Sequence, residues 1–553
     1  RNAGTAGKRE RGPTRVGTAP AWGIFRPHPP PTHDAVLHGA AAMTLITFVV
    51  LYLLVSIGIG LYAATRVKSS ADYAVAGRSL PLIMIITTTF ATWFGSETVL
   101  GVPAKFIEGG LEKTVSDPFG AGMALILVGA FFAARLYKMN LITIGQFYRE
   151  RYSRGVELFS AAVIMISYLG WVAAQITALG LVFTLLSGGA ITTVQGMIIG
   201  TVVVLSYTVF GGMWSVALTD FFQMIIIIAG LALIAWFAAD LAGGAGRVIE
   251  YAATKDMFNF WPEMTLNGWL FWIAAAITLM LGSIPQQDVF QRVMSANSSK
   301  TAVRGPIIGG LSYIAFAFVP IFIGVAAFLV IPDVANTLLK EDSQKILPTL
   351  VMEKMPIWLQ VLFFGALLSA IMSTASATLL APSTTFVENI LKNFRSLNDK
   401  GELKAMRVTL FVFAVCVLIY SIIMEGTPIY ELVALAYEFP VVGAFWPLVC
   451  GMYWRRSTTQ GAILSIVLGM GTWLALTLPG FIAGLAGDSA GPMLTALAAP
   501  GAAFPAVLGG FIMGGIGMFV GSLLPTEGNR IYLAGRHHEK MHAAHAHGTH
   551  AAQ

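Results

Sequence analysis

The stretch LPLIMIITTTFATWFGSETVLGVPAK, residues 80–105, decides how this chain folds. It is apolar over enough length to cross a bilayer, for which about 20 residues suffice. Yet it contains two glycines, a proline and an acid, Gly95, Gly101, Pro103 and Glu97. Glycine and proline weaken a helix, and a break inside a membrane survives only where protein or a water-filled cavity covers the freed backbone groups. We therefore expect residues 91–97 to be an unwound centre that faces a binding site. The alternative is a kinked helix with a glutamate near its outer end.

Composition sets the class of protein. The chain has 553 residues, of which 56% are hydrophobic and only 11% are charged. No soluble globular protein needs that much apolar surface, so we predict an all-α membrane protein with many spans. The two cysteines, Cys416 and Cys450, both lie in apolar runs and indicate neither a disulfide framework nor a cysteine metal site.

The apolar runs predict thirteen spans. They cover about 43–64, 80–104, 118–138, 157–186, 190–210, 213–240, 268–290, 303–331, 356–390, 407–424, 427–453, 459–480 and 503–524. We expect one transmembrane domain over 43–529, preceded by a disordered segment, 1–42, that is rich in Pro, Arg, Gly and His. Met43 is the expected natural start, and 530–553 is expected to be a His-rich cytoplasmic tail.

Basic residues alternate between the loops. Loops on one side hold 21 Lys and Arg residues, and loops on the other side hold 7. Cytoplasmic loops carry the excess of positive charge, so this bias places the N-terminus outside and the C-terminus inside a bacterial inner membrane. The net charge of +6 then reflects cytoplasmic loops and not nucleic-acid binding.

A second interrupted span lies five spans after the first. The sequence GWLFWIAAAITLMLGSIPQQDVFQRV, residues 268–293, contains Gly282 and Pro285, followed by Gln286, Gln287 and Asp288. Interrupted spans at matching positions of two blocks indicate an inverted repeat. The blocks are spans 2–6 and 7–11, with span 1 and spans 12–13 added outside.

Hydroxyl and acidic side chains occur at membrane depth in two further spans. Ala370, Ser373 and Thr374 share one face of the ninth span, with Ser376 one turn on. Hydroxyls beside unwound carbonyls favour a hard cation, whereas small hydroxyl residues also line close helix contacts. Asp220 in the sixth span is either a cap at the membrane interface or a cation ligand.

An aromatic stripe marks the fourth span. Tyr168, Trp171 and Gln175 follow each other at i, i+3 and i+7, so they lie on one face of a helix. Such stripes usually pack. Opposite a broken span that carries Trp93 and Glu97, this stripe is equally suited to binding a solute.

Three of these segments resemble the sodium:solute symporters, a family that includes sodium-coupled sugar, proline, sialic acid and choline carriers. SYTVFGGMWSVALTD is similar to the family's signature, IPQQDVFQRVMSANSSK to its Gln-Arg segment, and AIMSTAS to the sodium site of proline carriers. The resemblance covers essentially all of 43–524. It implies a ten-helix, LeuT-like 5+5 inverted repeat.

The resemblance also implies sodium ligands. The usual site is expected from main-chain oxygens of Ala91, Phe94 and Ala370 and from the hydroxyls of Ser373 and Thr374. Some members hold a second sodium with residues that correspond to Asp220, Ser373 and Ser376, where Ala377 replaces a further serine here. Glu97 matches a glutamate that contacts sugar in a bacterial galactose carrier, whereas ATWFG and Trp171 look more like choline carriers. Gln286 departs from both patterns.

The expected function is sodium-coupled import of a small polar solute by alternating access. The predicted substrate-binding residues are Trp93, Ser96, Glu97, Tyr168, Trp171, Gln175, Gln286 and Gln287. Carboxylate and ring faces favour an ammonium-bearing solute such as an amino acid, a betaine-like zwitterion or choline, with a sugar or a carboxylate as the alternative. A membrane sensor or a channel is the alternative of another class.

An enzyme is not expected. Every histidine lies outside 43–536, and the spans contain no evident nucleophile–base pair or metal-ligand set. The expected partners are therefore sodium, the solute and the lipid bilayer, with no nucleic acid and no obligatory protein partner.

Overall fold

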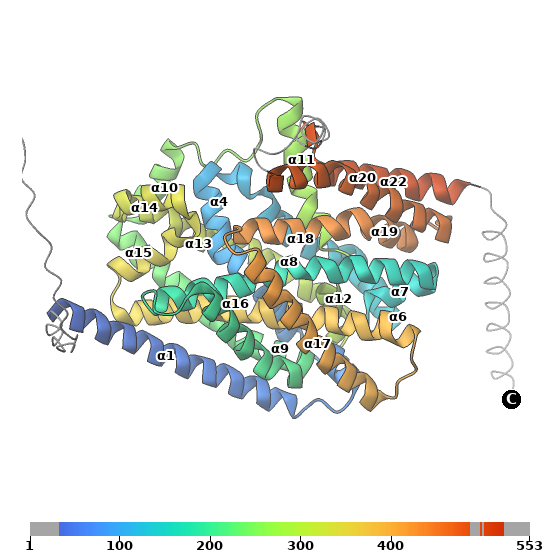
Figure 1. The fold of residues 1–553 in the computed structure, drawn as a ribbon, viewed down its shortest axis with the longest axis horizontal. Helices are drawn as coiled ribbons and strands as arrows, with labels where there is room; N and C mark the ends of the chain where they lie inside the picture. Colours follow the sequence, from blue (N-terminus) through green and yellow to red (C-terminus); the bar gives the residue numbers. More distant parts are fainter. Residues whose placement is uncertain (1–32, 487–497, 500, 502, 525–553) are drawn as a thin grey trace, which may run out of the picture.

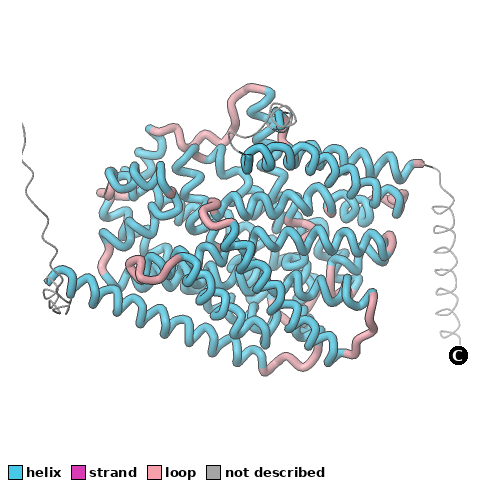
Figure 2. The backbone as a smooth tube through the Cα atoms, viewed as in Figure 1, coloured by secondary structure: helices cyan, strands magenta, loops and turns pink. Residues whose placement is uncertain are grey.

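The computed structural model describes residues 33–486, 498–499, 501 and 503–524. Across these residues the secondary structure is helical, with no strand and one isolated bridge (Figure 2). The long apolar helices lie beside one another in a single bundle (Figure 1). The predicted fold class, an all-α protein of many spans, is confirmed.

The longer helices follow the expected spans. In chain order they are α1 His33–Ala64, α2 Ser70–Val75, α3 Leu82–Trp93, α4 Val102–Gly109, α5 Ala121–Leu127, α6 Ala133–Met139, α7 Ile144–Arg151, α8 Arg154–Leu186, α9 Thr193–Leu241, α10 Ala245–Thr254, α11 Leu266–Gly282, α12 Gln287–Ser295, α13 Ser299–Val330, α14 Pro332–Glu341, α15 Ile346–Lys354, α16 Ile357–Thr385, α17 Asp399–Ile423, α18 Ile429–Gly443, α19 Phe445–Tyr453, α20 Thr459–Ala486 and α22 Ala506–Leu523. Short 3₁₀ and π segments complete them: η1 Ala76–Arg78, η2 Glu97–Gly101, η3 Leu111–Thr114, η4 Val115–Gly120, η5 Val128–Phe132, η6 Ser343–Lys345, η7 Phe386–Ile390 and η8 Leu391–Asn393.

The number of candidate spans is close to the thirteen expected. Among the described residues, nine helices are long and apolar enough to span a membrane, and the number rises to 12 when each bent pair counts as one span. At about 1.5 Å per residue, the 49 residues of α9 would extend about 74 Å if straight, far more than a bilayer core of about 30 Å. Gly212 interrupts α9 with a φ of 49° and a ψ of −138°, which only glycine adopts readily. The expected fifth and sixth spans are therefore joined at Gly212.

The two expected breaks are present. The axis bends by 55° between Leu82–Trp93 and Glu97–Gly109, and by 42° between Leu266–Gly282 and Gln287–Ser295. A third bend, of 44°, separates Ile429–Gly443 from Phe445–Tyr453 in the eleventh span, which the sequence analysis treats as continuous. Ala444 lies in this third break, and its carbonyl accepts a hydrogen bond of 2.9 Å from the hydroxyl of Tyr148.

The two broken spans are tied together at one end. The backbone N–H of Leu80 donates to the carbonyl of Ser295 at 2.9 Å, and the N–H of Asn297 donates to the carbonyl of Leu80 at 2.9 Å. These bonds form the isolated bridge between Leu80 and Ala296. The start of the second span and the end of the seventh span are thus held by main-chain hydrogen bonds, which any side chains at these positions would permit.

The helices outside the two five-span blocks lie at the edges of the bundle. α1 runs along one edge, and α20 and α22 pack against each other along the opposite edge (Figure 1). α1 begins at His33, so the last part of the 1–42 segment is helical and not disordered as expected. The run of small and apolar residues at 35–42, AVLHGAAA, is rich in alanine, the strongest helix former. Residues 1–32 and the expected tail, 530–553, lie outside the described residues.

Candidate functional site

The centre of the site is the break in the second span. α3 ends at Trp93, and Phe94 leaves the helical region with a φ of −87° and a ψ of 64°. The next helical turn begins at Glu97. The last carbonyls of a helix have no partner within it, so the end of α3, which includes Ala91, presents main-chain oxygens to its surroundings. Ala91 and Phe94 are fully buried there.

One hydroxyl of the predicted sodium site reaches this break. The Thr374 hydroxyl, on α16, donates to the carbonyl of Thr92 at 2.7 Å and to the carbonyl of Ala370 at 3.2 Å. The structure therefore brings the Ala370 and Thr374 region of the ninth span against the end of α3. Every polar atom in these contacts is an oxygen, and oxygen is the donor that a hard cation prefers.

Ser373 points elsewhere. Its hydroxyl donates to Oδ1 of Asp220 at 2.6 Å, and Oδ2 accepts from Thr88 at 2.5 Å and from Thr92 at 3.3 Å. Asp220 is fully buried, and both of its carboxylate oxygens accept hydrogen bonds from hydroxyls of other helices. Ser376, the other predicted partner of this aspartate, instead donates to the carbonyl of Ser373 at 3.0 Å. Thr88 and Thr92 complete an oxygen-rich cluster that the sequence analysis does not include.

Glu97 is held by the aromatic stripe of α8. Its Oε1 accepts from the indole of Trp171 at 2.9 Å, and its Oε2 accepts from the amide of Gln175 at 2.7 Å. The carbonyl oxygen of the Gln175 side chain accepts from the backbone N–H of Ser96 at 3.0 Å. Trp171, Gln175, Ser96 and Glu97 are thus brought together as predicted, and Glu97 is only 3% exposed.

Trp171, which donates to this carboxylate, belongs to a cluster of four rings that we call the aromatic cluster: Trp93, Tyr168, Trp171 and Tyr437. The centroids of Trp93 and Trp171 lie 5.3 Å apart, and Tyr437 lies 5.8 Å from the first and 5.3 Å from the second. Tyr168 stacks on Trp171 at 6.2 Å. Tyr437 comes from α18, and nothing in its local sequence distinguishes it from a packing residue.

Several polar atoms near the aromatic cluster have no partner. Trp93 Nε1, the Tyr437 hydroxyl, Gln286 Oε1 and Asp288 Oδ2 are all buried without a hydrogen bond. Buried polar groups are normally paired, because leaving one unpaired costs about 1–3 kcal/mol. A polar solute in this region would offer them partners.

Gly95 connects the two halves of the site. A Cβ atom placed on it would lie 2.5 Å from Oε2 of Glu97, 2.6 Å from the Thr374 hydroxyl and 3.0 Å from Oε1 of Gln175. The backbone at Gly95 therefore touches both the predicted sodium ligand and the predicted substrate carboxylate. No side chain fits between them.

The two glutamines after the second break separate. Gln286 donates to the Ser167 hydroxyl at 2.8 Å and stays near the aromatic stripe of α8. Gln287 accepts from the N–H of Ile144 at 2.9 Å and donates to the carbonyl of Ile142 at 3.3 Å. Gln287 thus fastens the segment before α7, away from the other predicted substrate residues.

Asp288 and Arg292 form part of the site although sequence reasoning did not assign them to it. The Tyr168 hydroxyl donates to Asp288 Oδ1 at 2.6 Å. Arg292 is 1% exposed and donates to the carbonyls of Asp288 and Thr88 and to the hydroxyl of Thr92. The signal available in the sequence was the pair of opposite charges, Asp288 and Arg292, at i, i+4 beside a broken span.

A further buried acid, Asp117, lies in η4. It accepts a hydrogen bond from the hydroxyl of Tyr313, which also lies 2.8 Å from the hydroxyl of Thr98. Thr98 in turn donates to the carbonyl of Trp93 at 3.2 Å. This chain of hydrogen bonds reaches the same break from the opposite side.

Comparison with known proteins adds the family. Residues 73–469 match the family model described as Sodium:solute symporter family. The High affinity choline transporter 1 of Homo sapiens is 28% identical over 450 residues, which cover 77% of this chain and 75% of that protein. The high-affinity proline transporter of Bacillus subtilis (strain 168) is 28% identical over 451 residues, covering 77% of this chain and 93% of that protein.

A solved structure supports the same architecture. The substrate-bound, outward-open state of a Na⁺-coupled sialic acid symporter aligns with a TM-score of 0.72 at 20% identity, covering 87% of this chain and 98% of that one. The expected LeuT-like fold is thereby confirmed.

Proposed function

Because the chain belongs to the sodium:solute symporter family, we propose that it uses sodium entry to import a small solute that bears an ammonium group. An amino acid such as proline, a betaine-like zwitterion and choline are the substrates of this class. The observation that carries the proposal is the buried Glu97 carboxylate, which accepts a hydrogen bond from Trp171 of the aromatic cluster.

The chemistry of this enclosure favours a cation. Both oxygens of Glu97 accept hydrogen bonds from neutral donors, and no salt bridge to Glu97 is formed within the described part of the chain. A buried carboxylate is costly to ionise without a positive partner. An ammonium group supplies that partner, and the ring faces attract it by up to about 2 kcal/mol where water is excluded.

The relatives support this class of substrate. The choline transporter and the proline transporter both take up solutes that carry a positively charged nitrogen. The sodium/pantothenate symporter of Escherichia coli (strain K12), 24% identical over 438 residues, represents the carboxylate alternative. A sugar remains the other alternative, because carboxylates and indoles also suit rings that bear several hydroxyls.

Sodium supplies the driving force. We propose that Ala91, Phe94, Ala370, Ser373 and Thr374 hold the ion, and that Asp220 with Ser373 provides the place for a second one. Moving one charge inward releases about 2.3 kcal/mol per 100 mV. A tenfold sodium gradient adds about 1.4 kcal/mol, so one ion supports an accumulation of roughly a few hundred-fold at about 100 mV.

The rest of the cycle follows from the broken spans. We propose that sodium joins the end of α3 to α16 and thereby favours the conformation that accepts the solute. The two repeats then rock around the central site and open it to the other side. In this scheme the protein lies in the bacterial inner membrane with its N-terminus outside and its C-terminus in the cytoplasm.

Uptake into proteoliposomes with an imposed sodium gradient tests the proposal. Glu97→Gln keeps the size of the side chain and removes its charge, so we expect severe loss of uptake of an ammonium-bearing substrate. Glu353→Gln, at an exposed position on α15, is the matched control. If Glu97→Gln transports normally, or if neutral sugars compete for uptake and amines do not, the substrate class is wrong.

A further inference from the structure

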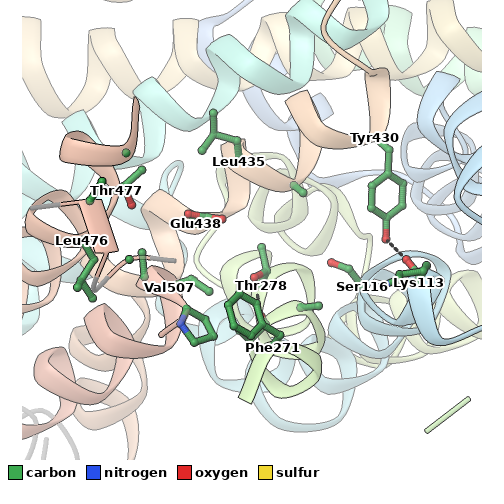
Figure 3. A pocket seen from close by; sticks show the side chains of 18 of the residues that line it. Lys113, Ser116, Phe271, Thr278, Tyr430, Leu435, Glu438, Leu476, Thr477 and Val507 are labelled. Atoms are coloured by element: carbon green, nitrogen blue, oxygen red, sulfur yellow. Dashed lines mark hydrogen bonds between the residues drawn. The ribbon is translucent and has the colours of Figure 1, made fainter. Parts of the chain in front are cut away.

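A cavity between α11 and α18 lies outside the central site, and we call it the α11–α18 cavity. Its volume is about 640 Å³, within the range of about 300–1,000 Å³ that is typical of pockets for drug-sized ligands. α20, α22 and η4 complete its walls (Figure 3).

This cavity is separate from the aromatic cluster. Its described lining includes no residue of α3, α4 or α8, which carry most of the central site or continue from it. α11 and α18 meet between the two: a Cβ atom on Gly282 would lie 2.4 Å from the carbonyl oxygen of Tyr437. Because Glu438 lines the cavity and its neighbour Tyr437 belongs to the aromatic cluster, α18 has one site on each of two faces.

The polar groups of the cavity are few and incompletely paired. Glu438 Oε2 accepts from the indole of Trp473 at 2.5 Å, and none of the hydrogen bonds found among the described residues involves Oε1. The hydroxyls of Ser116 and Thr477 are buried without partners, and Ser116 is only 4% exposed. The cavity therefore offers one carboxylate with an unbonded oxygen, the hydroxyls of Ser116 and Thr477, and one lysine, Lys113.

Lys113, Thr278 and Tyr430 also line the cavity, and the rest of its described lining is apolar. Phe271, Leu435, Leu476 and Val507 contribute large side chains around Glu438 (Figure 3). Burying the apolar part of a ligand against these walls contributes about 25 cal/mol of binding free energy for each Å² of apolar surface removed from water. Among the described residues no ion pair joins Lys113 to Glu438, so the cation of a ligand can pair with that carboxylate, and an aromatic ring such as Phe271 also attracts cations.

We propose that the α11–α18 cavity binds an amphipathic organic cation, with its ammonium group at Glu438 and its apolar body against Phe271, Leu435 and Val507. The ligand is larger than the solute of the central site and does not compete with it. It contacts α11, the first half of the broken seventh span, and α18 together. Its binding therefore holds these two helices in one arrangement and inhibits transport non-competitively.

Equilibrium binding of radiolabelled benzyltriethylammonium to the purified full chain tests the site without relying on transport. We expect Glu438→Gln to weaken binding at least tenfold and Ala275→Phe, which fills the cavity from α11, to abolish it. Glu425→Gln removes a charge at a position that does not line this cavity and should leave binding unchanged. The neutral isostere of the probe, with carbon in place of nitrogen, should bind at least tenfold more weakly.

Transport assays then distinguish a failure of this inference from a failure of the proposed function. In wild-type proteoliposomes the probe should lower the maximal rate of sodium-dependent uptake without changing the solute concentration for half-maximal uptake. Equal binding by Glu438→Gln, equal binding of the neutral isostere, or displacement of the probe by a transported solute would each overturn the proposal. If no solute is transported but binding still depends on Glu438, the cavity is confirmed and only the proposed substrate is wrong.

Discussion

The hydroxyl of Ser373 donates a hydrogen bond of 2.6 Å to Oδ1 of Asp220. Ser373 thereby belongs to the cluster around Asp220, while its neighbour Thr374 reaches the end of α3. Two adjacent residues on one helix thus bind to two different spans, α9 and α3. If the Ser373 hydroxyl binds a cation together with the α3 carbonyls, its hydrogen bond to Asp220 must break.

This contact predicts coupling between the two positions. Ser373→Ala and Asp220→Asn should each raise the sodium concentration for half-maximal uptake, and their effects should be non-additive by about 0.5–3 kcal/mol because the side chains touch. Thr374→Ala should also raise the sodium requirement, with weaker coupling to Asp220→Asn because these two residues are connected only through Thr92. Ser383→Ala removes a hydroxyl on the same helix that bonds only its own turn, and it is the control. Unchanged sodium dependence in both Ser373→Ala and Thr374→Ala would mean that this face only packs.

Gly95→Ala should disturb sodium and solute together. The added methyl group would approach Glu97 Oε2 and the Thr374 hydroxyl to 2.5 and 2.6 Å, closer than real Cβ contacts allow. We expect uptake to fall at least tenfold, with higher half-maximal concentrations of both sodium and solute in proteoliposomes. Gly365→Ala, on α16 with nothing within 4 Å of the added atom, should transport normally. Normal uptake by Gly95→Ala would show that this part of the break opens before either ligand binds.

Substitutions at Tyr437 distinguish the role of its ring from the role of its hydroxyl. Its hydroxyl has no partner, whereas its ring packs against Trp93 and Trp171. Tyr437→Phe should therefore keep near-normal apparent affinity for an ammonium substrate, and Tyr437→Ala should weaken it several-fold by removing up to about 2 kcal/mol of cation–π attraction. Concentration dependence of uptake measures both. If Tyr437→Phe weakens the apparent affinity as much as Tyr437→Ala does, the hydroxyl binds the solute.

Arg292 should stabilise the fold as well as the site. Its guanidinium joins Asp288 in the seventh span to Thr88 and Thr92 in the second. Breaking a buried charged pair costs about 3–5 kcal/mol, so Arg292→Gln should lower the unfolding temperature and the yield of purified protein. Arg304→Gln, at an exposed position of α13, should change neither. Equal unfolding temperatures for both variants would contradict this role.

The orientation can be tested with an impermeant thiol reagent in whole cells. In a background where Cys416 and Cys450 are replaced by serine, Lys113→Cys should be labelled and Lys400→Cys should not. The physical reason is the threefold excess of basic residues in the loops that include 391–406. The reverse pattern of labelling would invert the predicted topology.

The sequence by itself determined the spans, the two matching breaks and most of the residues around Glu97. Apolar length, helix-breaking residues and charge at membrane depth are local properties, because the bilayer imposes the same requirement on every segment. Trp171 and Gln175 could be assigned together since helical spacing places them on one face.

The tertiary structure alone decided which polar groups share a partner. Asp220 accepts hydrogen bonds from Ser373, Thr88 and Thr92. Gln287 bonds to the backbone near α7. Tyr437 joins the aromatic cluster from a position more than 250 residues after Trp171. The third break at Ala444 and the burial of Arg292 belong to the same group of features. Each depends on how helices rotate and pack against distant neighbours, where buried polar groups find their partners, and no local pattern encodes that arrangement.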